Sequence, residues 1–329
     1  MKRQGYWLMA LVLAMIFSLI FAVQAEGKRI LKYGHNAKQE QPTGRAALLF
    51  AKLVAKKTDG DLEIQVFPAN QLGKNRQMAE SLKMGAQDLL TMGLGGIGYI
   101  NTNYMMMQVP YVFRSQEHIR KVVAGDIGRE LKEDMAKRTG ILMLAQDWDR
   151  MVRHIGGTKP IRALNDLKGY KVRAGALPPI AGFKALGASP VKIPLNEMYV
   201  AIQQGVADGA ELPIDYFFNY SIYEVAKYLN LTYHTYGTQF IAINLRLWKS
   251  LKPVHQKALQ EAANEAGAYN NKLVAELEED YLNKLKNGGM EFVKTDTAAF
   301  QKALFKKIPE IAKNWPGTEE LFYRIQKVK

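Results

Sequence analysis

Apolar and polar positions repeat with two different periods along the first third of the chain. Over 62–66 they alternate one by one, which is the period of a half-buried strand. Over 44–58 apolar residues recur at steps of three and four, which predicts a helix with one buried face. Strands over 30–36 and 88–92 and a helix over 75–84 extend the alternation. This order is typical of parallel strands, whose ligands bind at their carboxyl ends.

The alternation restarts after residue 140 and predicts a second α/β block. A strand over 141–145 is followed by a charged segment, 147–150. The rest of this block is expected as strands over 171–173, 191–193 and 207–211 and helices over 178–186 and 196–204. Two more strands, 228–236 and 239–243, flank Gly237 and are placed to pass between the blocks.

One long helix is predicted over 253–287. Apolar residues recur there at steps of three and four, and Gly288 and Gly289 follow as a stop. At about 1.5 Å per residue this helix would span roughly 50 Å, which is longer than one small domain. We therefore expect it to brace both blocks.

The chain begins like an export signal. Lys2 and Arg3 precede an almost unbroken apolar stretch over 7–22, and Val-Gln-Ala at 23–25 fits a small-residue cleavage site. An uncleaved membrane anchor is the alternative, but the apolar run is short against the roughly 20 residues of a spanning helix. We interpret residues 1–25 as a cleaved signal peptide and expect a soluble, exported protein.

Composition narrows the class of partner. The roughly 300 residues that follow the predicted signal peptide suit two domains of about 150 residues each. The chain has a formal net charge of +14, which suggests an anionic partner. No long basic run or basic motif with interleaved aromatic residues is present, and this argues against nucleic acid. The absence of cysteine excludes disulfides, thiol nucleophiles and thiolate metal sites.

A glycine motif follows the strand predicted over 88–92. Gly93, Gly95 and Gly98 have the spacing G-x-G-x-x-G of a dinucleotide-binding loop. That fold needs a long helix next and then an acidic residue about 20 positions on. The residues up to Pro110 leave room for little more than one or two helical turns. We therefore predict no dinucleotide site and no other cofactor.

Enzyme motifs are also missing. The five histidines lack the spacing of a metal site on one helix, and neither a G-x-S-x-G elbow nor a G-K-[ST] loop occurs. The sequence therefore predicts no metal site and no catalytic residues. A hydrolase assembled from residues distant in the sequence stays an open alternative.

Two arginines are the best candidates for ligand chemistry. Arg153 lies in DWDRMVRHIGG, and Arg173 ends the predicted strand of DLKGYKVRAG. An arginine at the end of an interior strand is costly unless paired, and its planar fork fits a carboxylate with two parallel hydrogen bonds. The functional interpretation is a carboxylate clamp. The structural alternative is an internal salt bridge or a surface arginine.

Five stretches make the chain resemble the solute-binding proteins of tripartite ATP-independent periplasmic (TRAP) transporters, the DctP-type family. They lie in the family's order over nearly all of residues 28–310 and are LKYGHNA, FAKLVAKKTDGDLEIQVFPANQLG, MVRHIGGTKPIRALNDLKGYKVRAG, KALGASPVKIPLNEMYVAIQQGVADGAELP and YEVAKYLNLTYH. The resemblance implies an α/β, periplasmic-binding-protein-like fold. Two α/β domains enclose a ligand cleft, joined by long strands and a long bracing helix.

The resemblance also implies the division of the chain and its partners. Domain I is expected to comprise residues 26–150 plus 238–265, and domain II residues 151–237 plus 280–329, with the helix over 253–287 spanning both. The protein is expected to be a monomer that closes on a small carboxylate and delivers it to the membrane permease subunits of the transporter.

Individual residues carry over to the family's motifs. In the family, the arginine of DLKGxKxR pairs with the ligand carboxylate, which implies this role for Arg173. Arg153 matches an arginine that also reaches the ligand in members that bind sialic acid. Asn36 and Gln239 keep an asparagine and a glutamine of those members.

Four pocket positions depart from the members that bind sialic acid. A glutamate and an arginine of those members are replaced here by Gly93 and Gly96, a phenylalanine by Leu195, and an asparagine by Leu212. The two glycines are expected to leave room, and backbone N–H groups, for the ligand. Fewer hydrogen-bonding side chains argue against a polyhydroxylated sugar acid.

The same positions predict the character of the ligand. Leu195, Leu212 and Tyr216 or Phe217 suggest an apolar or aromatic body behind the carboxylate. Whether Arg150 serves a second carboxylate stays open.

The sequence thus predicts a periplasmic binding protein of a Gram-negative bacterium for an organic acid anion, a small mono- or dicarboxylate. An exported enzyme that uses the same cleft is one alternative. A ligand-sensing subunit for a receptor kinase is another, and it would share the pocket and differ only in its partner.

Overall fold

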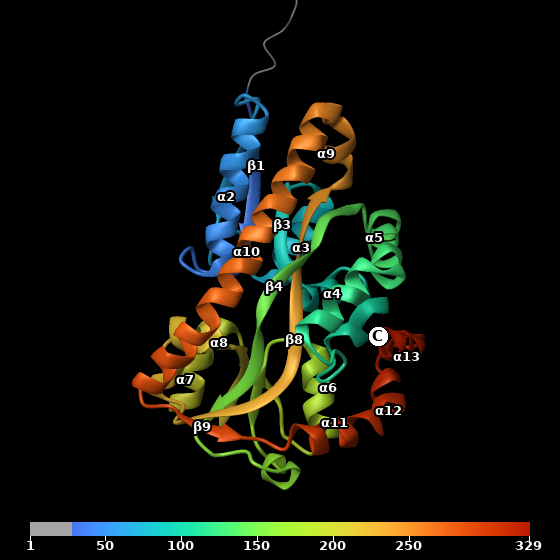
Figure 1. Cartoon of the computed structure of the whole chain (residues 1–329). Helices are drawn as coiled ribbons and strands as arrows, with labels where there is room; N and C mark the ends of the chain where they lie inside the picture. Colours follow the sequence, from blue (N-terminus) through green and yellow to red (C-terminus); the bar gives the residue numbers. More distant parts are fainter. Residues whose placement is uncertain (1–27) are drawn as a thin grey trace, which may run out of the picture.

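The computed structural model describes residues 28–329, so the predicted signal peptide lies outside the described residues. The first half of the chain forms β1 (Arg29–His35), α2 (Pro42–Lys57), β2 (Leu62–Phe67), α3 (Asn75–Met84), β3 (Leu89–Gly93), the 3₁₀ helices η1 (Leu94–Tyr99) and η2 (Thr102–Gln108), α4 (Gln116–Ala124), α5 (Asp126–Thr139) and β4 (Ile141–Gly157). Figure 1 shows these elements from blue to green.

The second half alternates in the same way before it ends in helices. It forms η3 (Leu164–Leu167), β5 (Val172–Ala174), α6 (Leu177–Ala185), β6 (Val191–Lys192), η4 (Leu195–Glu197), α7 (Met198–Gln203), β7 (Gly209–Pro213), α8 (Ile214–Asn219), η5 (Ile222–Glu224), β8 (Tyr228–Asn244), α9 (Leu245–Ser250), α10 (Pro253–Asn287), β9 (Glu291–Lys294), α11 (Thr297–Phe305), α12 (Ile308–Ala312) and α13 (Glu319–Lys327).

All strands join one sheet in the order β2-β1-β3-β8-β4-β7-β5-β6, with β9 on β8. Strands β2, β1 and β3 are parallel neighbours, as are β7, β5 and β6. We call β1–β3 with α2–α5 lobe I and β5–β7 with α6–α8 lobe II. The long antiparallel strands β4 and β8 run through both lobes (Figure 1). The α/β fold with two connecting strands is confirmed.

Two local expectations were wrong at the crossover. The segment 147–150 is part of β4, and the two strands expected over 228–236 and 239–243 form the single strand β8. Arg150 pairs with Gly237, so each irregular segment is completed by the other's backbone. Backbone hydrogen bonds between β4 and β8, which are distant in the sequence, extend both strands through the crossover. Local sequence patterns do not predict such bonds.

The glycine-rich segment after β3 forms η1, and η2 follows it. These two short 3₁₀ helices occupy the segment for which the sequence left room for only one or two helical turns. Buried methionines from η2, among them Met106 and Met107, pack in the core with Phe183 of lobe II.

Helix α10 has the predicted bounds and lies along both lobes (Figure 1). It contacts α2 of lobe I, the crossover strand β4 and α8 of lobe II. At the crossover, Trp148 is fully buried and its Nε1 donates to the carbonyl of Ala263 over 3.1 Å. Gly267 lies against the same indole, and a Cβ there would be 2.5 Å from Nε1.

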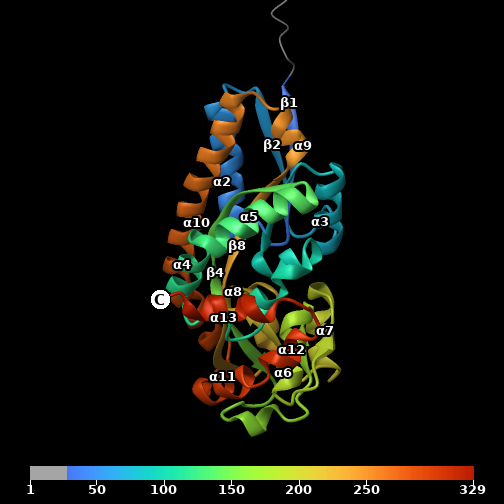
Figure 2. The ribbon, with the colours of Figure 1, turned by 90° about the vertical axis from the view of Figure 1, so that its right-hand side faces the viewer.

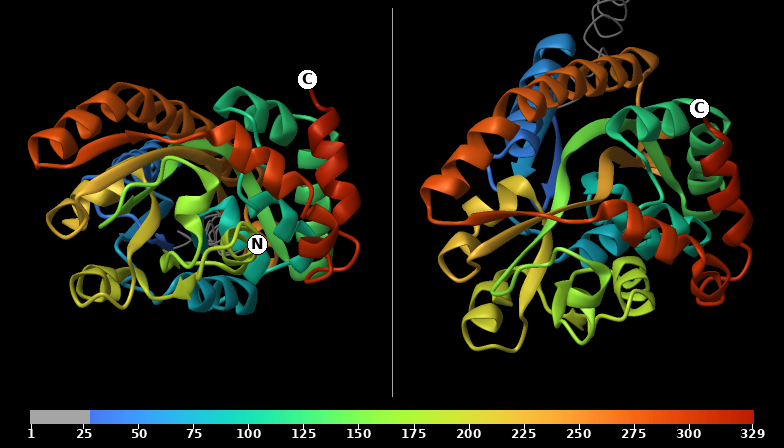
Figure 3. Two further views of the ribbon diagram at one scale, coloured as in Figure 1. Left: turned by 90° about the horizontal axis from the view of Figure 1, so that it is seen from below. Right: turned by 60° about the horizontal axis from the view of Figure 1, so that its bottom comes forward.

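The C-terminal segment returns from lobe II to lobe I. Figure 3 shows it running from the end of α10 to α13. His118 Nε2 of α4 lies 3.1 Å from the carbonyl of Ile325, and Arg324 pairs with Glu130 of α5 over 2.6 Å. Figure 2 shows α13 beside these lobe I elements. The sequence placed 280–329 with domain II, whereas α13 packs on lobe I.

Gly267→Ala tests the close approach of α10 to β4. In an open helix this change stabilises by about 0.5–1 kcal/mol. Here the added methyl group meets the buried indole of Trp148, so we expect the free energy of unfolding to fall by about 1–3 kcal/mol. Urea unfolding measures the change. Asn264→Ala, on the exposed face of α10, is the control and should change stability little. A more stable Gly267→Ala protein would contradict this packing.

Candidate functional site

A cavity of about 490 Å³ lies where the two lobes and the crossover strands meet. Its volume is within the roughly 300–1,000 Å³ of small-molecule sites. Asn36 follows β1, Gly93 ends β3, and Arg173 lies in the short strand β5. The cavity is therefore at the carboxyl ends of the parallel strands of both lobes, where ligands of such sheets bind.

The charged residues that line the cavity are nearly all basic. Glu211 is the acidic one, and the basic ones are Lys74, Arg76, Arg150, Arg153, Arg173 and Lys192. Low-dielectric walls concentrate the field of such a group of charges. The cavity therefore attracts an anion.

Arg173 is the most deeply buried of these cations. The residue is 5% exposed, and its Nε donates to the carbonyl of Ile193 over 2.9 Å. Burial lowers the pKa of its guanidinium to about 10, so the group stays charged at neutral pH. Within residues 28–329 no carboxylate lies at ion-pair distance from Arg173. Its terminal amino groups are thus available to an anion in the cavity.

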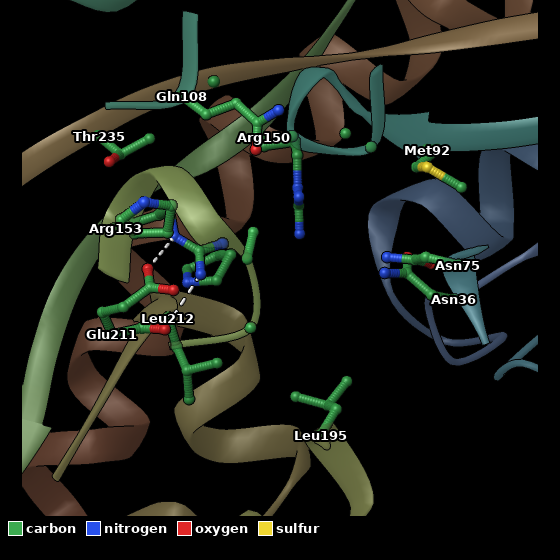
Figure 4. Close-up of a pocket in the computed structure, with 18 of the residues that line it drawn as sticks. Asn36, Asn75, Met92, Gln108, Arg150, Arg153, Leu195, Glu211, Leu212 and Thr235 are labelled. Carbon is green, nitrogen blue, oxygen red and sulfur yellow. Dashed lines mark hydrogen bonds and ion pairs between the residues drawn. The ribbon is translucent and has the colours of Figure 1, made fainter. Parts of the chain in front are cut away.

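Arg153 is paired within the protein. Its Nε lies 2.5 Å from Oε2 of Glu211, and its Nη2 donates to the carbonyl of the same residue over 3.0 Å (Figure 4). Burial by itself would raise the pKa of Glu211, but attraction by Arg153 and hydrogen bonds from His234 and Arg153 hold it at about 2. Arg153 therefore lines the cavity and also forms an internal salt bridge, which was the structural alternative to a carboxylate clamp.

A strand irregularity brings Arg150 to the same cavity as Arg153. Residues three apart on a regular strand point to opposite faces. The register of β4 against β8 shifts between these two residues, as at a β-bulge, and both line the cavity. The Arg150 guanidinium carbon lies 5.6 Å from the centre of the Tyr216 ring.

The two glycines do not leave open space for a ligand, which corrects the expectation from the sequence. A Cβ at Gly93 would collide with the guanidinium of Arg150, and one at Gly96 would collide with the thioether of Met92. Side chains of the protein already occupy the space beside both glycines. Gly93 and Gly96 nevertheless line the cavity with their backbone.

The other predicted site residues divide into two groups. Asn36, Leu195, Leu212 and Tyr216 line the cavity. Phe217 and Gln239 are not among its lining residues. Phe217 is fully buried against Gly156, and Gln239 donates to Oγ1 of Thr43 over 2.6 Å. Neighbouring helix residues point in different directions, which separates Tyr216 from Phe217.

Sequence reasoning missed several lining residues. An acidic residue in the apolar strand GAELP could have indicated Glu211, since a buried charge needs a partner. The polar residues Asn70, Asn75, Gln108, Asn196 and Thr235 also line the cavity. They come from loops, helix ends and β8, and no motif links them. The lining is consequently more polar than the predicted positions suggested.

A buried acid lies behind Arg150 and outside the lining. Asp215 is 6% exposed and accepts a hydrogen bond from Nε2 of Gln41 over 2.6 Å. Burial raises the pKa of Asp215 to about 6, and the charge of Arg150 opposes this rise. Gln41 belongs to lobe I and Asp215 to lobe II, so this bond joins the lobes.

Among residues 28–329, no group of three or more histidine, cysteine, aspartate or glutamate side chains is arranged to hold a metal ion. Over the same residues, none of the helices combines the length and the apolar character that a membrane-spanning helix needs.

The fold and the cavity define a class: a two-lobed binding protein with a basic pocket between its lobes. A family model described as bacterial extracellular solute-binding protein, family 7, matches residues 33–314. The chain belongs to this family, the solute-binding proteins of TRAP transporters.

Relatives match over nearly the whole chain. The 2,3-diketo-L-gulonate-binding periplasmic protein YiaO of Escherichia coli is 30% identical over 94% of this chain and 95% of its own length. A TRAP solute-binding protein of Polaromonas sp. JS666, solved with D-erythronate, is 32% identical with a TM-score of 0.84 and covers 91% and 99% of the two chains. One from Sulfurospirillum deleyianum, solved with succinate, is 30% identical with a TM-score of 0.83 and covers 92% and 100%.

Asp215→Asn tests the buried acid by its pH dependence. The native state holds the Asp215 proton more tightly than the unfolded chain, whose aspartate pKa is about 3.9. The native state therefore binds more protons between pH 4 and 6, and the free energy of unfolding falls as the pH rises through that window. The Asp215→Asn variant has no carboxyl group to ionise at this position, so its free energy of unfolding does not fall for this reason. Its stability relative to the parent should increase by about 2 kcal/mol between pH 4 and 7.

Urea unfolding at both pH values measures this difference. Asp59→Asn, at an exposed turn, removes one charge and is the matched control, with a difference near zero expected. A pH-independent difference for Asp215→Asn would show that the Asp215 carboxyl is ionised as readily in the native state as in the unfolded chain.

Proposed function

We propose that this chain captures an organic acid anion in the cavity between its lobes and delivers it to a TRAP permease. The observation that carries the proposal is Arg173, a buried guanidinium that stays charged and has no carboxylate at ion-pair distance among residues 28–329. A buried cation without a counter-ion is costly, and a ligand carboxylate supplies that counter-ion with two parallel hydrogen bonds.

Binding is expected to favour the closed arrangement of the lobes. The cavity is lined on the lobe I side by Asn36 and Met92, among others, and on the lobe II side by Arg173 and Leu195. A ligand that contacts both sides binds the closed form more tightly than the open one and so shifts the population towards it. The hydroxyl of Tyr99 in lobe I donates to the carbonyl of Gly175 in lobe II over 3.3 Å and supports the same closed form.

The cavity favours a compact acid with a polar and an apolar side. Figure 4 shows Asn36 and Asn75 on one side of the cavity, with Leu195 and Leu212 apart from them. Amide side chains suit keto or hydroxyl oxygens, and the leucines suit a short carbon skeleton. The ligands in the names of the similar proteins, 2,3-diketo-L-gulonate, D-erythronate and succinate, are all small organic acids, and the first two carry keto or hydroxyl oxygens. This amends the expectation of a wholly apolar or aromatic body.

The remaining assignments follow from export and binding without turnover. We expect residues 1–25 to be removed and the mature protein to act as a monomer in the periplasm, without catalysis. A sensing subunit would bind the same ligand and differ in its membrane partner, so capture of the permease subunits distinguishes transport from sensing.

Arg173→Lys tests the proposed ligand contact. Mature protein is first screened by thermal unfolding against organic acids, because a ligand that binds the native state raises its stability. For an acid that binds, the lysine variant should bind at least about tenfold more weakly by calorimetry, because a point charge replaces the planar fork.

Arg76→Lys is the control for that experiment. Arg76 also lines the cavity, but its side chain is 74% exposed and paired with Glu80. We expect its affinity to stay within about twofold of the parent, since exposed pairs contribute little. Unchanged affinity in Arg173→Lys would refute the clamp, and an acid returned chemically altered would favour an exported enzyme.

A further inference from the structure

Two polar contacts join the lobes behind the ligand cavity. The turn between β1 and α2 belongs to lobe I and α8 belongs to lobe II, and both helices contact α10 (Figure 1). Nζ of Lys38 donates to the carbonyl of Asn219 over 2.7 Å, and Nε2 of Gln41 donates to Oδ2 of Asp215 over 2.6 Å. These four residues all lie outside the cavity lining. The lobes are therefore joined at a place that a ligand in the cavity does not contact.

The lobe I turn is ordered by its own hydrogen bonds. The backbone N–H of Lys38 donates to Oε1 of Gln41 over 2.7 Å, and the backbone N–H of Gln41 donates to the carbonyl of Lys38 over 3.2 Å. The Gln41 amide is thus used at both ends, with its oxygen inside the turn and its nitrogen across to lobe II. A turn that is already ordered loses little conformational entropy when the other lobe packs on it.

A stack of side chains continues this contact to the wall of the cavity. Nζ of Lys38 lies 5.0 Å from the centre of the Tyr220 ring, and Tyr220 stacks on Tyr216 with ring centres 5.4 Å apart. Arg150 lies against the Tyr216 ring, and both of these residues line the cavity. The lobe I turn is therefore connected, through two aromatic rings, to residues that a ligand touches.

Asp215 completes the charge balance of this contact. Its carboxyl is buried within electrostatic reach of Arg150, so a lobe II acid compensates part of the charge of that guanidinium. The hydrogen bond from Gln41 reaches the same carboxyl from lobe I. Loss of that bond in the closed arrangement would leave a buried carboxyl oxygen without its lobe I donor, which is costly.

We propose that Lys38 and Gln41, together with α8, form a latch that stabilises the closed arrangement of the lobes without contacting the ligand. This inference rests on the proposed function, in which closure accompanies capture. Separation of the lobes breaks both hydrogen bonds and moves Lys38 away from the Tyr220 ring. The latch therefore determines how tightly any ligand is held, whereas the cavity determines which ligand binds.

The experiment measures the affinity and the dissociation rate of mature Lys38→Met and Gln41→Leu proteins by calorimetry and stopped flow. The probes are lactate, pyruvate, succinate, 2-oxoglutarate, gluconate and benzoate. Each variant should bind every acid that the parent binds about three- to tenfold more weakly, because a smaller fraction of molecules is closed. The factor should be the same for all of these acids. It should appear in the dissociation rate, since the latch forms after the ligand has entered.

Two variants with the same chemical changes are the controls. Gln39→Leu alters the same turn, but Nε2 of Gln39 donates to the carbonyl of Gly44 within lobe I. Lys52→Met removes an exposed lysine of α2. Both should keep affinities within about twofold of the parent. Lys38→Arg keeps a cation beside Tyr220 and should weaken binding less than Lys38→Met does.

A distance measurement tests the latch without a ligand. The chain has no cysteine, so Met84→Cys on α3 and Val200→Cys on α7 can carry one spin label on each lobe. Both positions are exposed, and Figure 2 shows α3 and α7 on the same side of the molecule. Adding Lys38→Met to this labelled protein should shift the distribution of label distances towards longer values.

Two results would overturn the inference: both latch variants bind every acid within about twofold of the parent, or the loss differs from acid to acid, which would make the turn part of the ligand site. Lys38→Met carries the test by itself if Gln41→Leu does not fold. If no acid binds the parent, the proposed function fails, and the label distances then decide the latch. Unchanged distances in Lys38→Met would refute it.

Discussion

The pairing of β4 with β8, irregular in register but extending through both lobes, holds the two halves of the fold together. Each strand has 17 residues and passes through both lobes. Their mutual hydrogen bonds satisfy the backbone where the chain crosses between the lobes, so this segment needs no loop. The register shift between Arg150 and Arg153 then directs both side chains to the cavity. The connection between the lobes and the binding chemistry therefore come from the same pair of strands.

The charged side chains near β4 and β8 differ in whether another group of the protein compensates their charge. Arg153 has Glu211, and the buried Asp215 has a hydrogen bond from Gln41. Arg173 is held by a backbone carbonyl, which fixes its direction and leaves its charge. In a low-dielectric cavity an uncompensated cation interacts strongly with an anion, and a side chain already held in place loses little entropy when it binds. The desolvation cost of burying the Arg173 guanidinium is therefore met when the protein folds, before the ligand binds.

The glycine-rich segment shows how a pattern is interpreted differently once the fold is known. Its spacing matches a dinucleotide loop, and the family comparison suggested an open wall of the cleft. Neither describes the arrangement around Gly93 and Gly96, where Arg150 and Met92 occupy the space that side chains would need. These glycines permit a close approach of other residues, and those residues come from β4 and from the end of β3.

Sequence patterns alone predicted the α/β alternation, the helix over 253–287, an anionic partner and the candidacy of Arg173 and Arg153. These features follow from local periodicity, composition and short motifs. Three features became evident only in the folded chain: the pairing of Arg153 with Glu211, the position of Phe217 and Gln239 outside the cavity lining, and the packing of α13 on lobe I. Strand register, a bulge and contacts between distant segments set side-chain direction, and none of these has a local signal in the sequence.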